Sequence, residues 1–195
     1  MRLTAPFRQA TRDDAQALAD FAHFASEGLA LHLWRRAAGP GGDAWAVGRE
    51  RATREAGAFS YRNAVIMEKD GRADAGLIGY PLPDQPEPIA DTMPPMFVPL
   101  QELENLAPAT WYVNVLAAYP EFRGLGCGTA LLGLAEDLAR SSARGDLSII
   151  VSDANVGARR LYERCGYRET AQRAKVKEDW VTPGAAWVLL TKPLR

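Results

Sequence analysis

The chain has 195 residues, 47% of them hydrophobic, and a formal net charge of −1 at pH 7. This length predicts one globular domain, residues 1–195, that buries about 70% of its unfolded surface around one core. The near-zero charge provides no field that attracts nucleic acid or an anionic membrane, and no apolar run approaches the ~20 residues that span a bilayer. We therefore expect neither nucleic acid nor a membrane as a partner.

Two cysteines, Cys127 and Cys165, are too few to indicate a disulfide framework, so free thiols in a reducing compartment are expected. Residues 1–9 lack the apolar core of a signal peptide. These features predict a cytoplasmic protein. No spacing of His, Cys and carboxylate residues resembles a metal site, and no metal is expected.

The first eighty residues predict helices followed by a β-hairpin. Thr11 with Asp13 and Asp14 supplies a cap and acidic first-turn residues for a helix. The turn residues at 69–72 separate two β-rich runs. The expected elements are an edge strand ending at Ala10, a helix after Thr11, a short helix at 29–37, a third helix from Asp43 toward Gly57, and strands at 63–68 and 73–80.

Residues 81–108 form a proline-rich acidic insertion without lysine or arginine. Eight prolines exclude a central strand, because proline cannot donate to a β ladder. One interpretation is a solvated excursion with a short helix around 98–106. The other is a lid over an acceptor pocket whose acidity favours cationic amines, since long loops in compact domains are often functional.

An apolar strand at 113–118 ends at Pro120 and leads into a glycine-rich turn before an amphipathic helix. Glycines at 124, 126 and 128 permit φ values that other residues resist, so successive N–H groups can point inward as an anion nest. The following helix adds its partly positive N-terminus. This arrangement is typical of pyrophosphate binding.

A P-loop is excluded because no lysine lies between Lys69 and Lys175, and a dinucleotide fingerprint fits the glycine spacing poorly. Arg123-x-x-Gly126-x-Gly128, preceded by Pro-Glu-Phe and followed by Thr-Ala-Leu-Leu, resembles the coenzyme A pyrophosphate loop of the GNAT superfamily of N-acetyltransferases. A second motif from Asn155 to Tyr167 resembles the N-x-x-A-x-x-L-Y-x-x-x-G-[FY] segment of that family. A short strand at 147–151 lies between the two motifs.

The resemblance implies an α/β fold: one GNAT-type domain with a mixed, mostly antiparallel twisted sheet, a splayed central strand pair and flanking helices. It implies acetyl-CoA as co-substrate, with the thioester arm lying in the opening beside the strand. The residues that the resemblance assigns to the cofactor are Leu116, Ala117, Ala118, Arg123, Gly124, Leu125, Gly126, Cys127, Gly128, Thr129 and Asn155.

Asn155 and Tyr162 are seven residues apart, which places them on one helical face about 10.5 Å apart. The resemblance makes Asn155 a cap that also bonds the cofactor amide, and Tyr162 the general acid for the departing thiolate. The alternatives are a simple N-cap and a half-buried aromatic residue with a satisfied hydroxyl. Leu161 and Cys165 are expected in the core, and Cys127 is expected to pack beneath the loop.

Many family members carry a glutamate base on the strand before the loop, but residues 110–118 contain no carboxylate. The base therefore stays open among candidates from three segments: Tyr112, Asn114, Glu102, Glu104, Glu27 and His32. The expected reaction is transfer of an acetyl group to an amine by direct attack, through a tetrahedral intermediate. A non-catalytic acyl-CoA-binding module is the alternative.

The acceptor is expected to be a small-molecule or peptide amine, chosen by the first two helices and the insertion. Many relatives are dimers, which makes a homodimer a further partner to consider.

Overall fold

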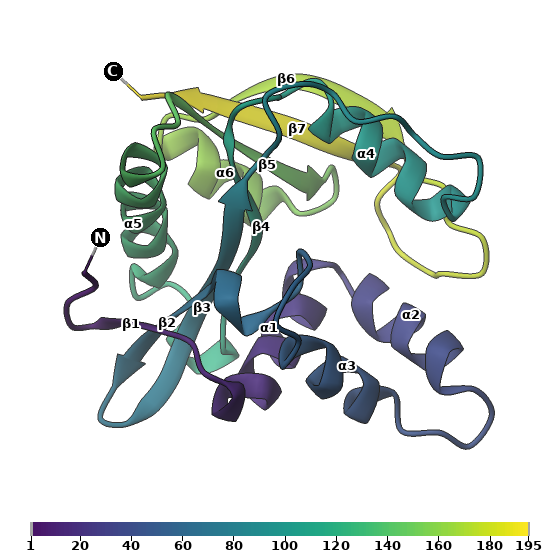
Figure 1. Ribbon diagram of the computed structural model, residues 1–195, viewed down its shortest axis with the longest axis horizontal. Coiled ribbons are helices and arrows are strands. Elements are labelled where there is room, and N and C mark those ends of the chain that lie inside the picture. Colours follow the sequence, from purple (N-terminus) through teal and green to yellow (C-terminus); the bar gives the residue numbers. More distant parts are fainter. Residues whose placement is uncertain (1, 195) are drawn as a thin grey trace. The chain divides into compact units, whose positions relative to one another are not determined.

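The computed structural model describes residues 2–194 (Figure 1). Its helices are α1 (Ala15–Ala25), α2 (Leu29–Ala38), α3 (Ala44–Ala52), α4 (Val98–Glu104), α5 (Cys127–Ser141) and α6 (Val156–Arg164). Its strands are β1 (Phe7–Gln9), β2 (Ala64–Lys69), β3 (Arg72–Pro81), β4 (Trp111–Ala118), β5 (Asp146–Ser152), β6 (Arg168–Ala174) and β7 (Ala186–Pro193).

Within residues 2–194 these strands form a seven-stranded sheet in the order β1-β2-β3-β4-β5-β7-β6. β1 with β2, β2 with β3, and β7 with both β5 and β6 are antiparallel, whereas β4 and β5 are parallel. The prediction of a mixed, mostly antiparallel sheet with flanking helices is confirmed. The splay of the central pair stays a prediction.

The chain is divided into two compact units, each built from two separate segments. One comprises Met1–Tyr80 with Asn114–Leu131, and the other comprises Pro81–Val113 with Leu132–Arg195. The boundary passes through β4 and through α5, so each of these elements contributes to both units. The prediction of a single domain over residues 1–195 stays a prediction.

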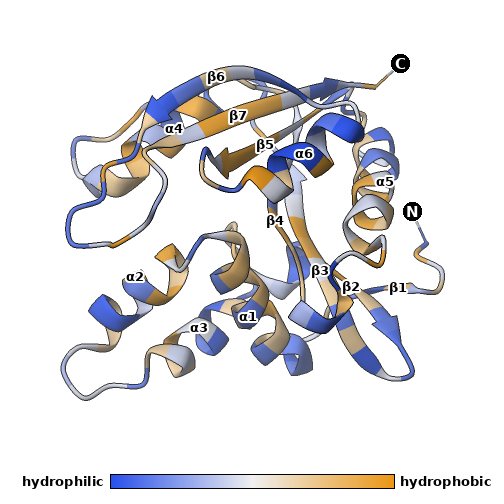
Figure 2. Cartoon of the chain, turned by 180° about the vertical axis from the view of Figure 1, so that it is seen from behind, coloured by the Kyte–Doolittle hydropathy of each residue, from blue (hydrophilic) through white to orange (hydrophobic). Residues whose placement is uncertain are grey.

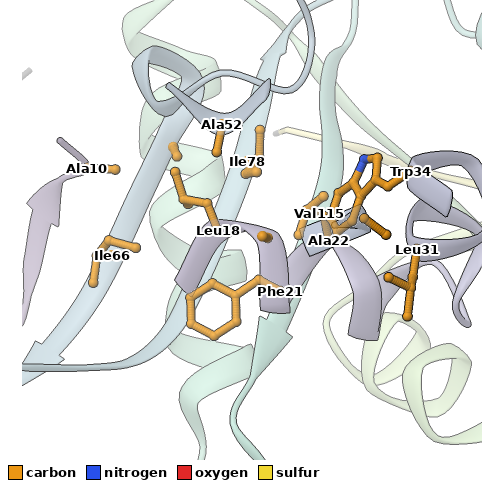
Figure 3. Close-up of a cluster of buried hydrophobic side chains, with 13 residues drawn as sticks. Ala10, Leu18, Phe21, Ala22, Leu31, Trp34, Ala52, Ile66, Ile78 and Val115 are labelled. Carbon is orange, nitrogen blue, oxygen red and sulfur yellow. The ribbon is translucent and has the colours of Figure 1, made fainter. Parts of the chain in front are cut away.

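The core of the first unit forms where α1 packs on the hairpin. Leu18, Phe21 and Ala22 of α1 lie toward Ile66 and Ile78 of the strands, and all five are buried (Figure 3). Trp34 and Leu31 of α2 and Val115 of β4 belong to the same cluster, together with five further buried alanines. The middle of α1 approaches β3 closely at Gly76, where a Cβ would lie 2.5 Å from the Phe21 ring. Burial of this apolar face holds the helices on the sheet.

The N-terminal helices begin as predicted, but the third is shorter than expected. Asp43 caps α3 by accepting a hydrogen bond from the Ala46 N–H at 3.1 Å. The helix ends at Ala52 instead of continuing toward Gly57, because Thr53 closes its last turn with a side-chain hydrogen bond to the Glu50 carbonyl at 2.8 Å.

In the second unit, β5 is paired with β7 along its whole length, from Asp146 opposite Pro193 to Ser152 opposite Trp187. Figure 2 shows β5 and β7 coloured hydrophobic and β6 largely hydrophilic. This contrast fits an interior pair of strands and an exposed edge strand.

The insertion of residues 81–108 contains α4, which confirms the predicted short helix. α4 packs against β6 and β7, and its Glu102 forms an ion pair of 2.7 Å with Arg173 of β6 (Figure 1). The remaining residues of the insertion are mostly exposed and irregular, apart from a 3-10 turn at Pro95–Phe97.

Candidate active site

The turn between β4 and α5 is shaped by a short 3-10 turn and an arginine. Pro120–Phe122 form the 3-10 turn, which ends β4 as the proline predicts. The Arg123 Nε–H donates to the Ala118 carbonyl at 3.2 Å, and the guanidinium lies 5.3 Å from the centre of the Phe24 ring. Arg123 therefore fastens the end of the strand to the start of the loop.

Residues 123–129, the glycine loop, follow at once. Gly124 and Gly126 have φ values of +77° and +88°, in the left-handed region that favours glycine, and a Cβ at either position would meet no atom within 4 Å. Both lie in exposed backbone. The open space on the loop leaves room for a ligand at the backbone itself.

The first intrahelical hydrogen bond of α5 runs from the Ala130 N–H to the Gly126 carbonyl at 3.0 Å. The N–H groups of Cys127, Gly128 and Thr129 therefore precede the first intrahelical donor and need partners from outside the helix. With the helix dipole they form an anion-binding end. Gly128 differs from the sequence expectation, because it lies in the first turn of α5 and not in a left-handed turn.

Cys127 is buried, and its thiol donates to the Phe122 carbonyl at 3.6 Å. This contact confirms that the side chain packs beneath the loop. Both Cys127 and Cys165 are free thiols, as predicted.

The end of β4 presents two faces. Val115, Ala117 and Tyr119 pack against the α1 cluster, so Leu116 and Ala118 point to the opposite face by the alternation of a strand. The Tyr119 hydroxyl donates to Asp20 of α1 at 2.8 Å. The pairing of residues 116–118 with a thioester arm stays a prediction.

Asn155 and Tyr162 lie in the other unit. Asn155 is the N-cap of α6, and its side-chain oxygen accepts from the Ala158 N–H at 3.1 Å. Its amide nitrogen has no hydrogen-bond partner within residues 2–194 and is available to a ligand. The predicted cap is confirmed, and contact with a cofactor stays a prediction.

Tyr162 is the buried residue of α6, with 5% of its surface exposed. Its ring centre lies 6.1 Å from that of Tyr167, and among the described residues its hydroxyl has no hydrogen-bond partner. Burial raises the pKa of Tyr162 above its usual value, which keeps the phenol protonated at neutral pH. Leu161 and Cys165 are only half-buried, so the expectation that they form the core face of α6 is wrong.

The residues that the sequence offers as candidates for the general base lie in different surroundings. Glu102 is engaged with Arg173, whereas burial, followed by the charge of Glu87, raises the pKa of Glu104 to about 7. Asn114 is half-buried on β4, and Tyr112 is buried on the same strand. Sequence analysis missed Asp20, because its partner Tyr119 lies 99 residues away.

No group of three His, Cys, Asp or Glu side chains within residues 2–194 is arranged to hold a metal ion. Over the same residues, every helix is too short or too polar to cross a bilayer.

The sequence pattern of the acetyltransferase (GNAT) family matches residues 29–167. Comparison with the sequences of curated proteins gives no match.

Three solved structures share the fold. An acetyltransferase has a TM-score of 0.63 at 19% identity, over 97% of this chain and 99% of that one. An N-acetyltransferase from Staphylococcus aureus Mu50 has a TM-score of 0.66 at 16% identity, over 95% and 98%. A GNAT family acetyltransferase from Elizabethkingia anophelis, solved with acetyl-CoA bound, has a TM-score of 0.51 at 18% identity, over 67% and 75%.

The sheet order, the glycine loop at a helix start and the capped α6 fit the acyltransferase class that the family pattern indicates. The chain belongs to the acetyltransferase (GNAT) family.

Proposed function

We propose that this protein transfers an acetyl group from acetyl-CoA to an amine. The observation that carries the proposal is the glycine loop, where two left-handed glycines lead into a helix whose first N–H groups need outside partners. A diphosphate satisfies such donors and the helix dipole together. Arg123, at the same turn, adds a guanidinium for the phosphates or the loop carbonyls.

In the proposed reaction the amine nitrogen attacks the thioester carbonyl carbon and forms a tetrahedral intermediate. A backbone N–H of residues 116–118 stabilises the oxyanion, an interaction typically worth about 2.7–4 kcal/mol. The carbon–sulfur bond then breaks, the nitrogen loses a proton to a base or to water, and the sulfur gains one. No covalent enzyme intermediate is involved.

Tyr162 is proposed to act as the acid toward the departing sulfur, which it stabilises by a hydrogen bond until water protonates the thiolate. Its burial and its unpartnered hydroxyl support this role. The ordinary pKa of a thiol, about 8.5, lies below that of a phenol, so complete transfer is uphill. We therefore expect the hydroxyl to donate a hydrogen bond to the sulfur as the bond breaks. Asn155 is proposed to hold the cofactor through its amide nitrogen.

The second candidate function is an acyl-CoA-binding module without turnover. It is favoured by the absence of a carboxylate from residues 110–118 of the sequence. The presence of Tyr162 at the tyrosine position of the family motif favours the enzyme.

Calorimetry of the purified protein with coenzyme A, acetyl-CoA and NAD tests the donor. We expect binding of the first two and none of NAD; no heat with coenzyme A at millimolar concentration overturns the proposal. Thiol release from acetyl-CoA in the presence of a panel of amines then separates the enzyme from the binding module.

We propose a small-molecule or peptide amine as acceptor, and no nucleic acid. The free thiols support a cytoplasmic location. Gel filtration at micromolar concentration tests the homodimer.

A further inference from the structure

Lys175, the residue after β6, is a buried cation that the proposed reaction does not use. Only 8% of its surface is exposed. Its ammonium donates to the Ser152 hydroxyl at 2.6 Å and lies 4.4 Å from the centre of the Trp187 ring and 5.2 Å from that of Trp180. Burial of a charge is costly, so this side chain needs compensating interactions, which the hydroxyl and the two indole faces supply.

The backbone of residues 175–185 closes tightly over this ammonium. The Lys175 N–H donates to the Ala185 carbonyl at 2.9 Å, and the Asp153 carboxylate accepts from the Ala185 N–H at 3.0 and 3.2 Å. A Cβ on Gly184 would lie 2.3 Å from the Ser152 hydroxyl and 2.4 Å from the Lys175 nitrogen. The segment is therefore fastened onto the end of β5 with no spare room.

Ser152 connects the ammonium to the start of α6. Its hydroxyl also accepts from the Ala154 N–H at 3.3 Å, and its carbonyl accepts from the Asn155 N–H at 3.1 Å. Both bonds shape the turn of residues 152–155. Asn155 is the N-cap that begins α6.

We infer that Lys175 is a positioning residue of the cofactor site: through Ser152 it fixes the turn that presents the Asn155 amide. This inference rests on the proposed function, because it concerns the cofactor residue of that function. An apolar side chain would leave the Ser152 hydroxyl without its donor and would remove the lysine charge that attracts the Asp153 carboxylate. The turn would then sample other conformations, and the Asn155 amide would lose its fixed direction.

The test measures coenzyme A affinity by calorimetry at 10 °C for Lys175→Met, Lys175→Arg, Ser152→Ala and Asn155→Ala, which requires no acceptor. We expect about tenfold weaker binding for Lys175→Met and for Ser152→Ala, and partial recovery for Lys175→Arg. The double variant Lys175→Met with Asn155→Ala should bind no more weakly than the weaker single variant, because both act on one contact.

Lys177→Met is the matched control. Lys177 lies in the same segment and donates to the Thr182 carbonyl at 3.1 Å, away from Ser152. The affinity of the Lys177→Met variant for coenzyme A should stay within about twofold of that of the unaltered protein, a change within the error of such measurements.

Circular dichroism of each variant separates positioning from folding. If Lys175→Met melts earlier but binds coenzyme A normally when folded, the inference is overturned. If Lys175→Met does not fold, the Ser152→Ala variant replaces it in the test, and normal coenzyme A binding by folded Ser152→Ala overturns the inference. If the unaltered protein binds no coenzyme A, the proposed function fails and this inference with it, whereas normal binding by the variants overturns this inference alone.

Discussion

Tyr162 and Gly126 have the residue-scale features with the most direct consequences. Tyr162 is buried and its hydroxyl bonds no described residue, and the neighbouring Tyr167 hydroxyl is also buried without a partner, so the family motif and not burial singles out Tyr162. Gly126 has a backbone conformation that a Cβ strains even though the space around it is open.

Tyr162→Phe should reduce turnover by about 10²-fold or more, because it removes the acid that stabilises the departing sulfur. Coenzyme A affinity should change by less than about threefold, since the ring stays in place. Thiol-release kinetics and calorimetry measure the two quantities. Tyr61→Phe is the control, because it removes a hydroxyl bonded to Glu55 at 2.8 Å. Near-normal turnover of Tyr162→Phe would exclude the acid role.

Gly126→Ala should weaken coenzyme A binding about tenfold or more, because the strained turn misdirects the N–H groups of the loop. Gly133→Ala is the matched control within α5: Gly133 lies in exposed helix, and its added Cβ would meet no atom within 4 Å. The control should raise the free energy of unfolding by about 0.5–1 kcal/mol and leave binding unchanged. Equal affinity in both variants would count against the loop as the diphosphate site.

At the scale of elements, α4 carries two glutamates in different surroundings. Glu102 forms a surface ion pair, whereas the surroundings of Glu104 disfavour its charged form. Glu104 lies in a pocket with Glu87, and Asn105 holds Glu87 there by accepting from its N–H at 2.9 Å and donating to its carbonyl at 2.8 Å. Glu102 of the same helix is paired with Arg173. Ionisation of Glu104 therefore costs stability.

Because the pKa of Glu104 is raised, we expect the free energy of unfolding to fall as pH rises. Burial, followed by the charge of Glu87, raises its pKa from 4.5 to about 7 in the folded protein. The folded state thus binds the proton more tightly, and its contribution is fully present below pH 4.5 and lost as pH rises through 7. The loss amounts to about 3 kcal/mol, from about 2.5 pKa units at 1.36 kcal/mol each.

Glu104→Gln should remove most of this dependence and stabilise the protein at pH 8. Urea unfolding at pH 5 and pH 8 measures both effects. Glu163→Gln, at an exposed position of α6, is the control and should leave the dependence unchanged. An equal pH dependence in Glu104→Gln and the unaltered protein would contradict the assignment.

At the scale of the whole molecule, each unit is assembled from segments far apart in the sequence. The core of the first unit contains Val115 of β4, and Ala117 and Tyr119 pack against it. Residues 1–80 alone therefore lack part of their own core.

A fragment of residues 1–80 should not fold cooperatively, because it leaves the apolar face of α1 without its β4 partner. Circular dichroism should show a broad thermal transition, and addition of a peptide of residues 111–131 should sharpen it. A sharp melt of the fragment alone would contradict this expectation.

The features that could be predicted are those that depend on residues close together in the sequence. The hairpin turn, the cap at Asp43, the glycine loop and the Asn155 cap follow from local backbone chemistry, and all four are present. The third helix was predicted too long because its ending depends on Thr53, which the pattern did not mark.

The sequence by itself determined the family, the strand-loop-helix of the glycine loop and the helix that Asn155 caps and that carries Tyr162, since each depends on neighbours in the chain. Only the tertiary structure decided that Asp20 bonds Tyr119, that Glu104 lies half-buried near Glu87, and that Lys175 donates to Ser152 beside the stacked rings of Trp180 and Trp187. These partners are separated by 5 to 99 residues, and their contacts exist only once the strands, helices and loops that carry them have packed.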